Sequence, residues 1–176
     1  MSLLRFLGLG NDGAGRDAEP EAILELAERL EATPTPDARL AAAFAYLLAR
    51  VADADLNIDA AEQNIMRDRI AGFGEISPDQ ALTLAEAASH VAQSRGAAND
   101  HLVARAFRDM TDRKERLRLL RCLYAVAAAD DTISNREDNE IFEIANAIGI
   151  SRSDVIAVRA RWKDYLGSMK ALPKER

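Results

Sequence analysis

The stretch PDARLAAAFAYLLARVADA, residues 36–54, decides the fold class of the chain. A set of its apolar residues recurs three or four positions apart, which is the spacing that places side chains on one face of an α-helix. This set consists of Leu40, Ala43, Phe44, Leu47, Leu48 and Val51. The pattern therefore predicts a helix that continues to about Ala54.

The same periodicity predicts helices along the rest of the chain, and no segment alternates apolar and polar residues as a half-buried strand does. Ser77 and Ser134 mark helix starts, and Gly74 and Gly149 mark helix ends. The predicted helices cover about 23–30, 36–54, 59–73, 77–95, 99–110, 112–129, 134–148 and 151–166. We expect an all-α fold, a single bundle of seven to eight helices. The helix at 112–129 should lie in its centre, because more than one of its faces is apolar.

The length and composition indicate one globular domain. A chain of 176 residues can bury a self-sufficient core. Alanine is its most frequent residue, which favours helices that pack closely through small side chains. The single cysteine, Cys122, excludes a disulfide framework and a cysteine zinc cluster. We expect a flexible N-terminal segment at 1–16, a helical domain at 17–168 and a C-terminal tail at 169–176.

The charge distribution indicates which classes of binding partner the chain can have. The net charge is −6, and residues 1–100 are net negative whereas residues 101–176 are net positive. An acidic total argues against nucleic-acid binding, because neutralising phosphates needs a dominant cationic surface. Basic residues gather between Arg105 and Arg121. This basic cluster is either a solvated helix face or a docking patch for an acidic protein partner.

The sequence predicts a cytoplasmic protein. No apolar run approaches the length of about 18 residues that a transmembrane helix requires. The first ten residues, MSLLRFLGLG, lack the apolar core and the cleavage site of a signal peptide. Their leucines and phenylalanine either pack against the body of the protein or make weak peripheral contact with the inner membrane face.

The chain contains an internal repeat. Residues 48–74 match residues 123–149 at a constant offset of 75. The nine identities are Leu48/Leu123, Val51/Val126, Ala52/Ala127, Ala54/Ala129, Asp55/Asp130, Ile58/Ile133, Glu62/Glu137, Asn64/Asn139 and Gly74/Gly149. In each copy a helix ends at an acidic loop that leads into a second helix. The repeat predicts two superposable helical hairpins with their acidic loops in comparable positions.

The acidic loops, ADADLNIDAAE (52–62) and AAADDTISNRE (127–137), have two interpretations. Asp59 with Glu62 and Ser134 with Glu137 have the spacing of capping boxes, so capping alone explains each glutamate. The aspartates that precede each loop stay unexplained, because a carboxylate at a helix C-terminus faces the unfavourable end of the helix dipole. Hard cations such as Ca²⁺ or Mg²⁺ prefer clusters of oxygen ligands. The candidate metal ligands are Asp55, Asp59, Glu62, Asp130, Asp131 and Glu137.

The doubled pattern resembles the TerB-like tellurite-resistance domain, in which a helix junction carries Ala-x-Ala-Asp-Gly-x-Ile/Val-x-x-x-Glu. The similarity covers about 40–166, and the residues that match the pattern are Asp55 and Glu62 in one copy and Asp130 and Glu137 in the other. The resemblance implies an all-α, cytoplasmic, non-enzymatic module. It also implies acidic residues that bind a metal, and a role in stress-response complexes with protein partners, some of them associated with the membrane.

The chain departs from the family pattern after each aspartate. Leu56 and Asp131 stand where the family favours glycine. Leucine tolerates a left-handed backbone poorly, so the first loop is expected to differ in shape from the second.

No catalytic constellation is readable in the sequence. It shows no nucleophile with its base, no paired acid and base and no phosphate cradle after a strand, so we expect no enzymatic activity. Trp162 and Tyr165 fall on a helical apolar stripe, where they serve the core or contact a partner, and Cys122 is expected to be a buried thiol. Two functions stay open: a metal-binding module of tellurite-type stress response, and a metal-free scaffold that docks a partner through its charged faces.

Overall fold

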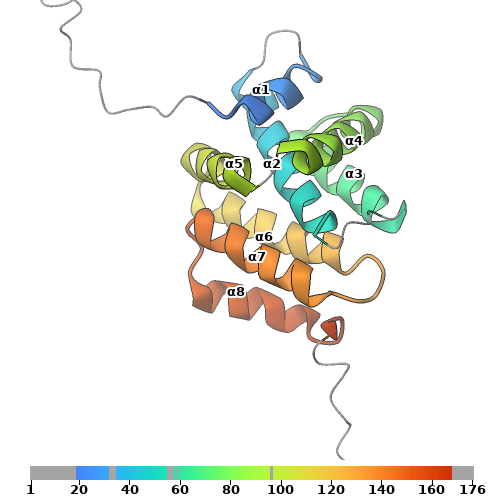
Figure 1. Cartoon of the computed structure of the whole chain (residues 1–176), viewed down its shortest axis with the longest axis vertical. Coiled ribbons are helices and arrows are strands. Elements are labelled where there is room, and N and C mark those ends of the chain that lie inside the picture. Colours follow the sequence, from blue (N-terminus) through green and yellow to red (C-terminus); the bar gives the residue numbers. More distant parts are fainter. Residues whose placement is uncertain (1–18, 32–34, 55–57, 59, 96, 168–176) are drawn as a thin grey trace, which may run out of the picture.

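The computed structural model describes residues 19–31, 35–54, 58, 60–95 and 97–167. These residues form one helical bundle without a named strand, which confirms the predicted fold class (Figure 1). Its helices are α1 (Glu21–Ala27), α2 (Pro36–Ala52), α3 (Ala60–Gly74), α4 (Pro78–Arg95), α5 (Ala97–Met110), α6 (Arg113–Ala127), α7 (Asn135–Ala147), α8 (Arg152–Arg159) and the short 3₁₀ helix η2 (Ala160–Trp162). The predicted N-terminal segment, 1–16, and C-terminal tail, 169–176, lie outside the described residues.

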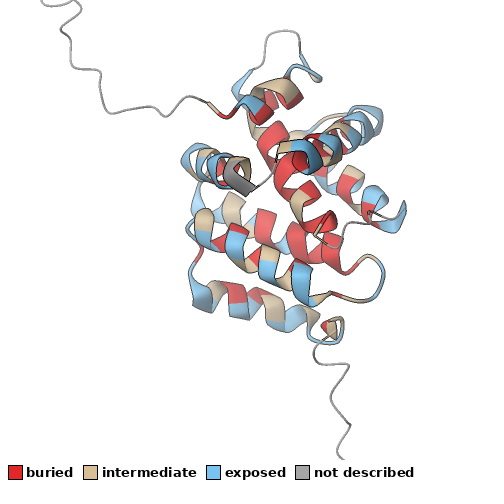
Figure 2. Cartoon of the chain, in the orientation of Figure 1, coloured by how far each residue is buried: buried red, intermediate tan, exposed pale blue. Residues whose placement is uncertain are grey.

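Helix α2 occupies the centre of the bundle. It contacts α1, α3, α4, α5, α6 and α7, and most of its residues are buried (Figure 2). Helix α6, which the sequence placed in the centre, packs against α2, α3, α7 and α8. Helix α6 therefore lies between other helices, as its apolar faces predicted, and α2 contacts more helices because the alanines around its apolar stripe let neighbours pack on every face.

Helix starts follow the local capping chemistry. Thr35 accepts a hydrogen bond from the backbone N–H of Ala38 at 3.2 Å, and Ser151 accepts one from the N–H of Asp154, also at 3.2 Å. Asp112 begins α6 with a capping box in which Glu115 is the reciprocal partner. Each cap supplies an acceptor to a backbone N–H that lacks an intrahelical partner.

Several helices end earlier than the periodicity predicted, and one of them is α1, which ends at Ala27. Helix α2 ends at Ala52 and α6 at Ala127, each followed by a turn. Helix α8 ends at Arg159, and the chain then passes through η2 and a turn to an isolated parallel bridge between Leu166 and Ile133. The backbone N–H of Ile133 donates to the carbonyl of Tyr165 at 2.7 Å, so the segment after α8 is tied to the loop between α6 and α7.

The helix bounds keep the 75-residue offset at both acidic junctions. Helices α2 and α6 end at Ala52 and Ala127, and α3 and α7 begin at Ala60 and Asn135. Superposition of the two hairpins stays a prediction. Helices α6, α7 and α8 lie in successive layers on one side of the molecule, below α2 and α5 in Figure 1.

Among the described residues, no helix combines the length and the apolar character that a membrane crossing needs.

Candidate functional site

The loop between α6 and α7 contains the second acidic motif. Asp130 and Asp131 are exposed at its surface, and Asp130 Oδ1 accepts a hydrogen bond from the backbone N–H of Thr132 at 2.9 Å. At the end of the loop, the backbone N–H of Ser134 donates to Glu137 Oε2 at 2.7 Å, and the N–H of Glu137 donates to Ser134 Oγ at 3.2 Å. The predicted capping box is confirmed, and it accounts for the burial of Glu137, which is 4% exposed.

Asp131 adopts a left-handed backbone with φ of 67°. This is the position at which the family pattern favours glycine, the residue that adopts this conformation without a steric penalty. Asp is among the few other residues that tolerate it. The α6–α7 loop therefore has the backbone shape that the pattern implies, although its sequence departs from it.

The loop between α2 and α3 is only partly described. Asp55 and Asp59 lie outside the described residues, and Glu62 is buried in the first turn of α3. Asp53, the C-cap of α2, is buried and accepts a hydrogen bond from Gln93 Nε2 of α4 at 2.8 Å. The aspartate nearest the end of α2 thus joins two helices, a role that the sequence did not indicate.

Of the candidate ligands, the structure places Glu62 at the first helix junction, and Asp130, Asp131 and Glu137 at the second. Among the residues that it describes, no three His, Cys, Asp or Glu side chains form a group suited to hold a metal ion. The oxygen-rich donors of the α6–α7 loop fit a hard cation in chemical type. Whether they bind one stays a prediction.

Three arginines of the predicted basic cluster, Arg113, Arg116 and Arg118, bond to other parts of the protein itself. Arg113 of α6 pairs with Asp154 of α8 at 2.9 Å, and Arg116 Nη1 donates to the carbonyl of Ile148 at 3.0 Å. Arg118 Nη2 donates to the carbonyl of Gly72 at 2.5 Å. These arginines satisfy carbonyls at the C-terminal ends of α7 and α3 or pair with a neighbouring helix, so they hold helices together.

A second group of charges joins α2, α5 and α7. Arg50 Nε lies 3.0 Å from Asp100 Oδ2, and Arg50 Nη2 lies 3.2 Å from Glu140 Oε1. Tyr46 donates its hydroxyl to Asp100 Oδ1 at 2.6 Å. Burial raises the pKa of Glu140, and burial together with the bond to Asp100 raises the pKa of Tyr46. This cluster is internally paired, and we interpret it as a structural link between the three helices.

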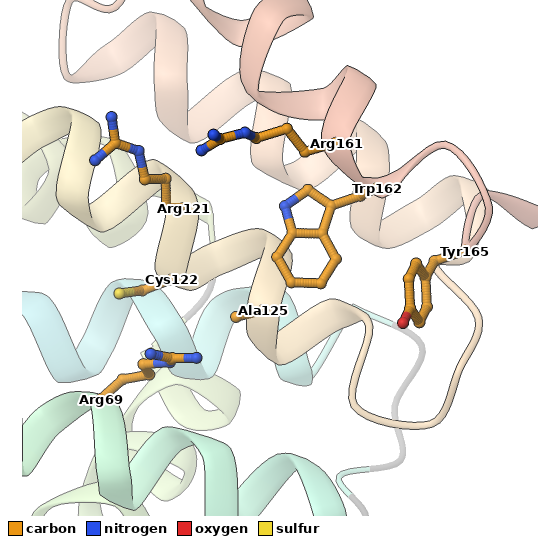
Figure 3. Close-up of a pocket in the computed structure, with 7 residues that line it drawn as sticks. All are labelled: Arg69, Arg121, Cys122, Ala125, Arg161, Trp162 and Tyr165. Atoms are coloured by element: carbon orange, nitrogen blue, oxygen red, sulfur yellow. The ribbon is translucent and has the colours of Figure 1, made fainter.

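A hollow of about 430 Å³ lies over α6, between α3 and the segment after α8 (Figure 3). The residues that line it are Arg69, Arg121, Cys122, Ala125, Arg161, Trp162 and Tyr165. Trp162 and Tyr165 are half-buried and contact each other edge to face, with ring centroids 5.6 Å apart. Cys122 is buried, as predicted, and its pKa is raised by burial. Sequence reasoning missed this hollow because its three arginines come from three separate elements.

Comparison with family models finds that the model described as tellurite resistance protein TerB matches residues 39–160. This range includes both acidic junctions and most of the helical bundle. A comparison with curated proteins and with solved structures finds no further match.

Proposed function

The chain belongs to the TerB family of tellurite resistance proteins, and we propose that it is a non-enzymatic module that binds a divalent cation at its acidic inter-helix loops and acts in a stress response. The cation is Ca²⁺ or Mg²⁺, because the candidate ligands of both loops are carboxylates, which hard cations prefer.

The observation that carries the proposal is the α6–α7 loop. Its left-handed residue, Asp131, stands at the glycine position of the family pattern, and this turn leaves Asp130 and Asp131 exposed next to each other. Two adjacent carboxylates at the surface of a turn offer the oxygen ligands that a hard cation prefers. The proposal assigns the aspartates of each loop to the cation and the glutamates mainly to the helix starts.

The separate roles of the glutamates and the aspartates follow from their burial and their hydrogen bonds. Glu62 and Glu137 are 7% and 4% exposed, and Glu137 already accepts the backbone N–H of Ser134. A glutamate in this place fixes where the following helix begins, and so it fixes the position of the loop carboxylates. Glu137 is therefore a positioning residue whose substitution would weaken cation binding indirectly.

Calorimetric titration and thermal unfolding with Ca²⁺, Mg²⁺, Mn²⁺ and Zn²⁺ test the cation. The wild-type chain should bind Ca²⁺ or Mg²⁺ and unfold at a higher temperature in its presence, since a ligand that binds only the folded state stabilises it. The double variant Asp55→Asn with Asp130→Asn should lose both responses. Asp79→Asn, at an exposed carboxylate in the first turn of α4, is the matched control and should keep them.

The outcome also decides between the two functions. Absence of any cation response in the wild-type chain, or an unchanged response in the double variant, would contradict the proposal. The alternative would then be a metal-free scaffold that docks a partner through its charged faces. The role in stress is tested by the survival in tellurite of a sensitive bacterial host that expresses either the wild-type chain or the double variant.

A further inference from the structure

Three arginine side chains line the hollow over α6 and bring positive charge together there. Arg69 comes from α3, Arg121 from α6 and Arg161 from η2. In Figure 3 the side chain of Arg161 extends toward Arg121, and Arg69 lies on the other side of Cys122. The charges of Arg69 and Arg121, together with that of Arg118 outside the hollow, act on the Cys122 thiol and partly offset the rise in its pKa that burial causes. Two of the three cations thus act on one point of the floor of the hollow.

In the described ranges of the chain, several other arginines are held by ion pairs, and the arginines of the hollow are not. Arg39, Arg50, Arg95, Arg113 and Arg159 each form an ion pair with an Asp or Glu. Within the described part of the chain, the guanidinium groups of Arg69, Arg121 and Arg161 have neither a hydrogen bond nor an ion pair. Like charges that share one hollow repel each other, and an anion placed among them relieves that repulsion. Guanidinium groups are also suited to phosphate oxygens, to which they donate two parallel hydrogen bonds.

The remaining lining is apolar and aromatic. Cys122 and Ala125 form the floor, each 8% exposed, and the half-buried rings of Trp162 and Tyr165 form one wall. A hollow of about 430 Å³ has the size of sites that take small organic ligands. A flat ring stacks on an indole, and a phosphate binds to the arginines next to it.

We propose that the hollow between α3, α6 and η2 binds a small organic phosphate, with its phosphate groups on Arg69, Arg121 and Arg161 and a flat ring on Trp162. The chemistry is that of a nucleoside phosphate. The ligand of this hollow is an anion, whereas the acidic loops are proposed to bind a cation. The two proposals concern different sites and are tested independently.

The chain carries its own reporters for this test. Trp162 is its single tryptophan and Cys122 its single cysteine, and both line the hollow. ADP, pyrophosphate and adenosine are titrated separately into the full chain in the presence of a chelator, so that cation binding does not contribute. Trp162 fluorescence should change and saturate with ADP, the rate of Cys122 alkylation should fall, and the affinity should decrease as salt rises.

The three ligands separate the two parts of the proposal. ADP should bind more tightly than pyrophosphate, which lacks the ring, and adenosine, which lacks the phosphates, should bind most weakly. Equal affinity for ADP and pyrophosphate would overturn the ring contact with Trp162. The absence of saturable binding of ADP and of pyrophosphate would overturn the site.

Variants of the arginines locate the binding. Arg121→Gln and Arg161→Gln are at exposed positions, so the fold should persist, and each should weaken ADP binding about tenfold or more. Arg152→Gln, at an exposed arginine at the start of α8, is the matched control for net charge and should bind as the wild type does. If the hollow variants and the control weaken binding equally, the effect is one of overall charge and the assignment to this hollow is wrong.

Discussion

The two helix junctions, α2–α3 and α6–α7, have the same spacing but use their acidic residues differently. At the first, the C-cap residue Asp53 is buried and bound by Gln93 of α4. At the second, the C-cap residue is Ala128, and the acidic residues Asp130 and Asp131 are exposed in the loop. The first junction holds a carboxylate inside the bundle, whereas the second presents two to solvent.

The comparison shows which residues of the repeated motif determine where the second helix begins. Both junctions keep an isoleucine before the second helix and a buried glutamate in its first turn, at Glu62 and Glu137. At the second junction, Ile133 fills the core next to the cap and Glu137 binds the backbone of the cap, so these residues fix where α7 begins. The aspartates have no such constraint, so they can serve different purposes in the two copies.

The largest effect is expected at the isoleucine that precedes α7. Ile133 is 1% exposed and its backbone pairs with Tyr165 and Gly167 after α8. Ile133→Ala should lower the free energy of unfolding by about 2–5 kcal/mol, because it removes buried methyl groups and leaves a cavity. Chemical denaturation measures the loss. The matched variant Ile58→Ala, at a half-buried position, should lower the free energy of unfolding by less. Equal losses would show that the two isoleucines contribute equally to stability.

The next effect concerns the cap of α7. Ser134→Ala removes the acceptor of the Glu137 N–H and should lower the free energy of unfolding by about 1–2 kcal/mol. Thr83→Ala, which removes an exposed hydroxyl in the middle of α4, is the control and should change stability by less than about 0.5 kcal/mol. If both substitutions cost the same, the capping box is not what sets the start of α7.

Most of the fold could be predicted from the sequence, because periodicity and capping are local. Asp112, Ser134 and Ser151 cap helices whose predicted ranges begin at these residues, and Gly149 follows α7 with φ of 75°. The end of α8 could not be predicted. Tyr165 and Leu166 keep the spacing of a helix, but their backbone pairs with Ile133, a contact that only the folded chain creates.

The candidate sites were predictable to different degrees. The acidic loops are contiguous in sequence, so their carboxylates were found, whereas the partner of Asp53 lies forty residues away in α4 and could not be inferred. The arginines of the hollow are also far apart in the sequence. Arg69, Arg121 and Arg161 each look like a solvated helix residue when read alone, and only the packing of α3, α6 and η2 brings them together.

The sequence of the second loop can be made to resemble that of the first by one substitution. Asp131→Leu places in the left-handed position the residue type that stands at Leu56, and it should lower the free energy of unfolding by about 1 kcal/mol. Asp131→Gly removes the steric penalty and should not destabilise the protein by more than a few tenths of a kcal/mol. Thermal or chemical unfolding of both variants measures the difference. An Asp131→Leu protein as stable as Asp131→Gly would mean that the left-handed turn does not constrain this loop.

The smallest effect is expected at the C-cap of α2, where Asp53→Ala gives the first junction the alanine that the second has at Ala128. Two effects oppose each other. The substitution loses the hydrogen bond from Gln93, but it also removes a negative charge from the C-terminal end of α2, where the helix dipole disfavours it. The net loss should be about 0.5–1 kcal/mol, measured by chemical denaturation in the presence of a chelator.

The same Asp53→Ala measurement, repeated with Ca²⁺ or Mg²⁺ in place of the chelator, sharpens the comparison of the junctions. Since Asp53 is buried and bonded within the protein, its substitution should cost the same with and without the cation. Gln93→Ala is the paired control, because it removes the same hydrogen bond and leaves the carboxylate in place. A loss that grows when the cation is added, in Asp53→Ala but not in Gln93→Ala, would contradict a purely structural role. It would show that the carboxylate at the end of α2 takes part in cation binding, and that the two junctions are closer in function than their hydrogen bonds suggest.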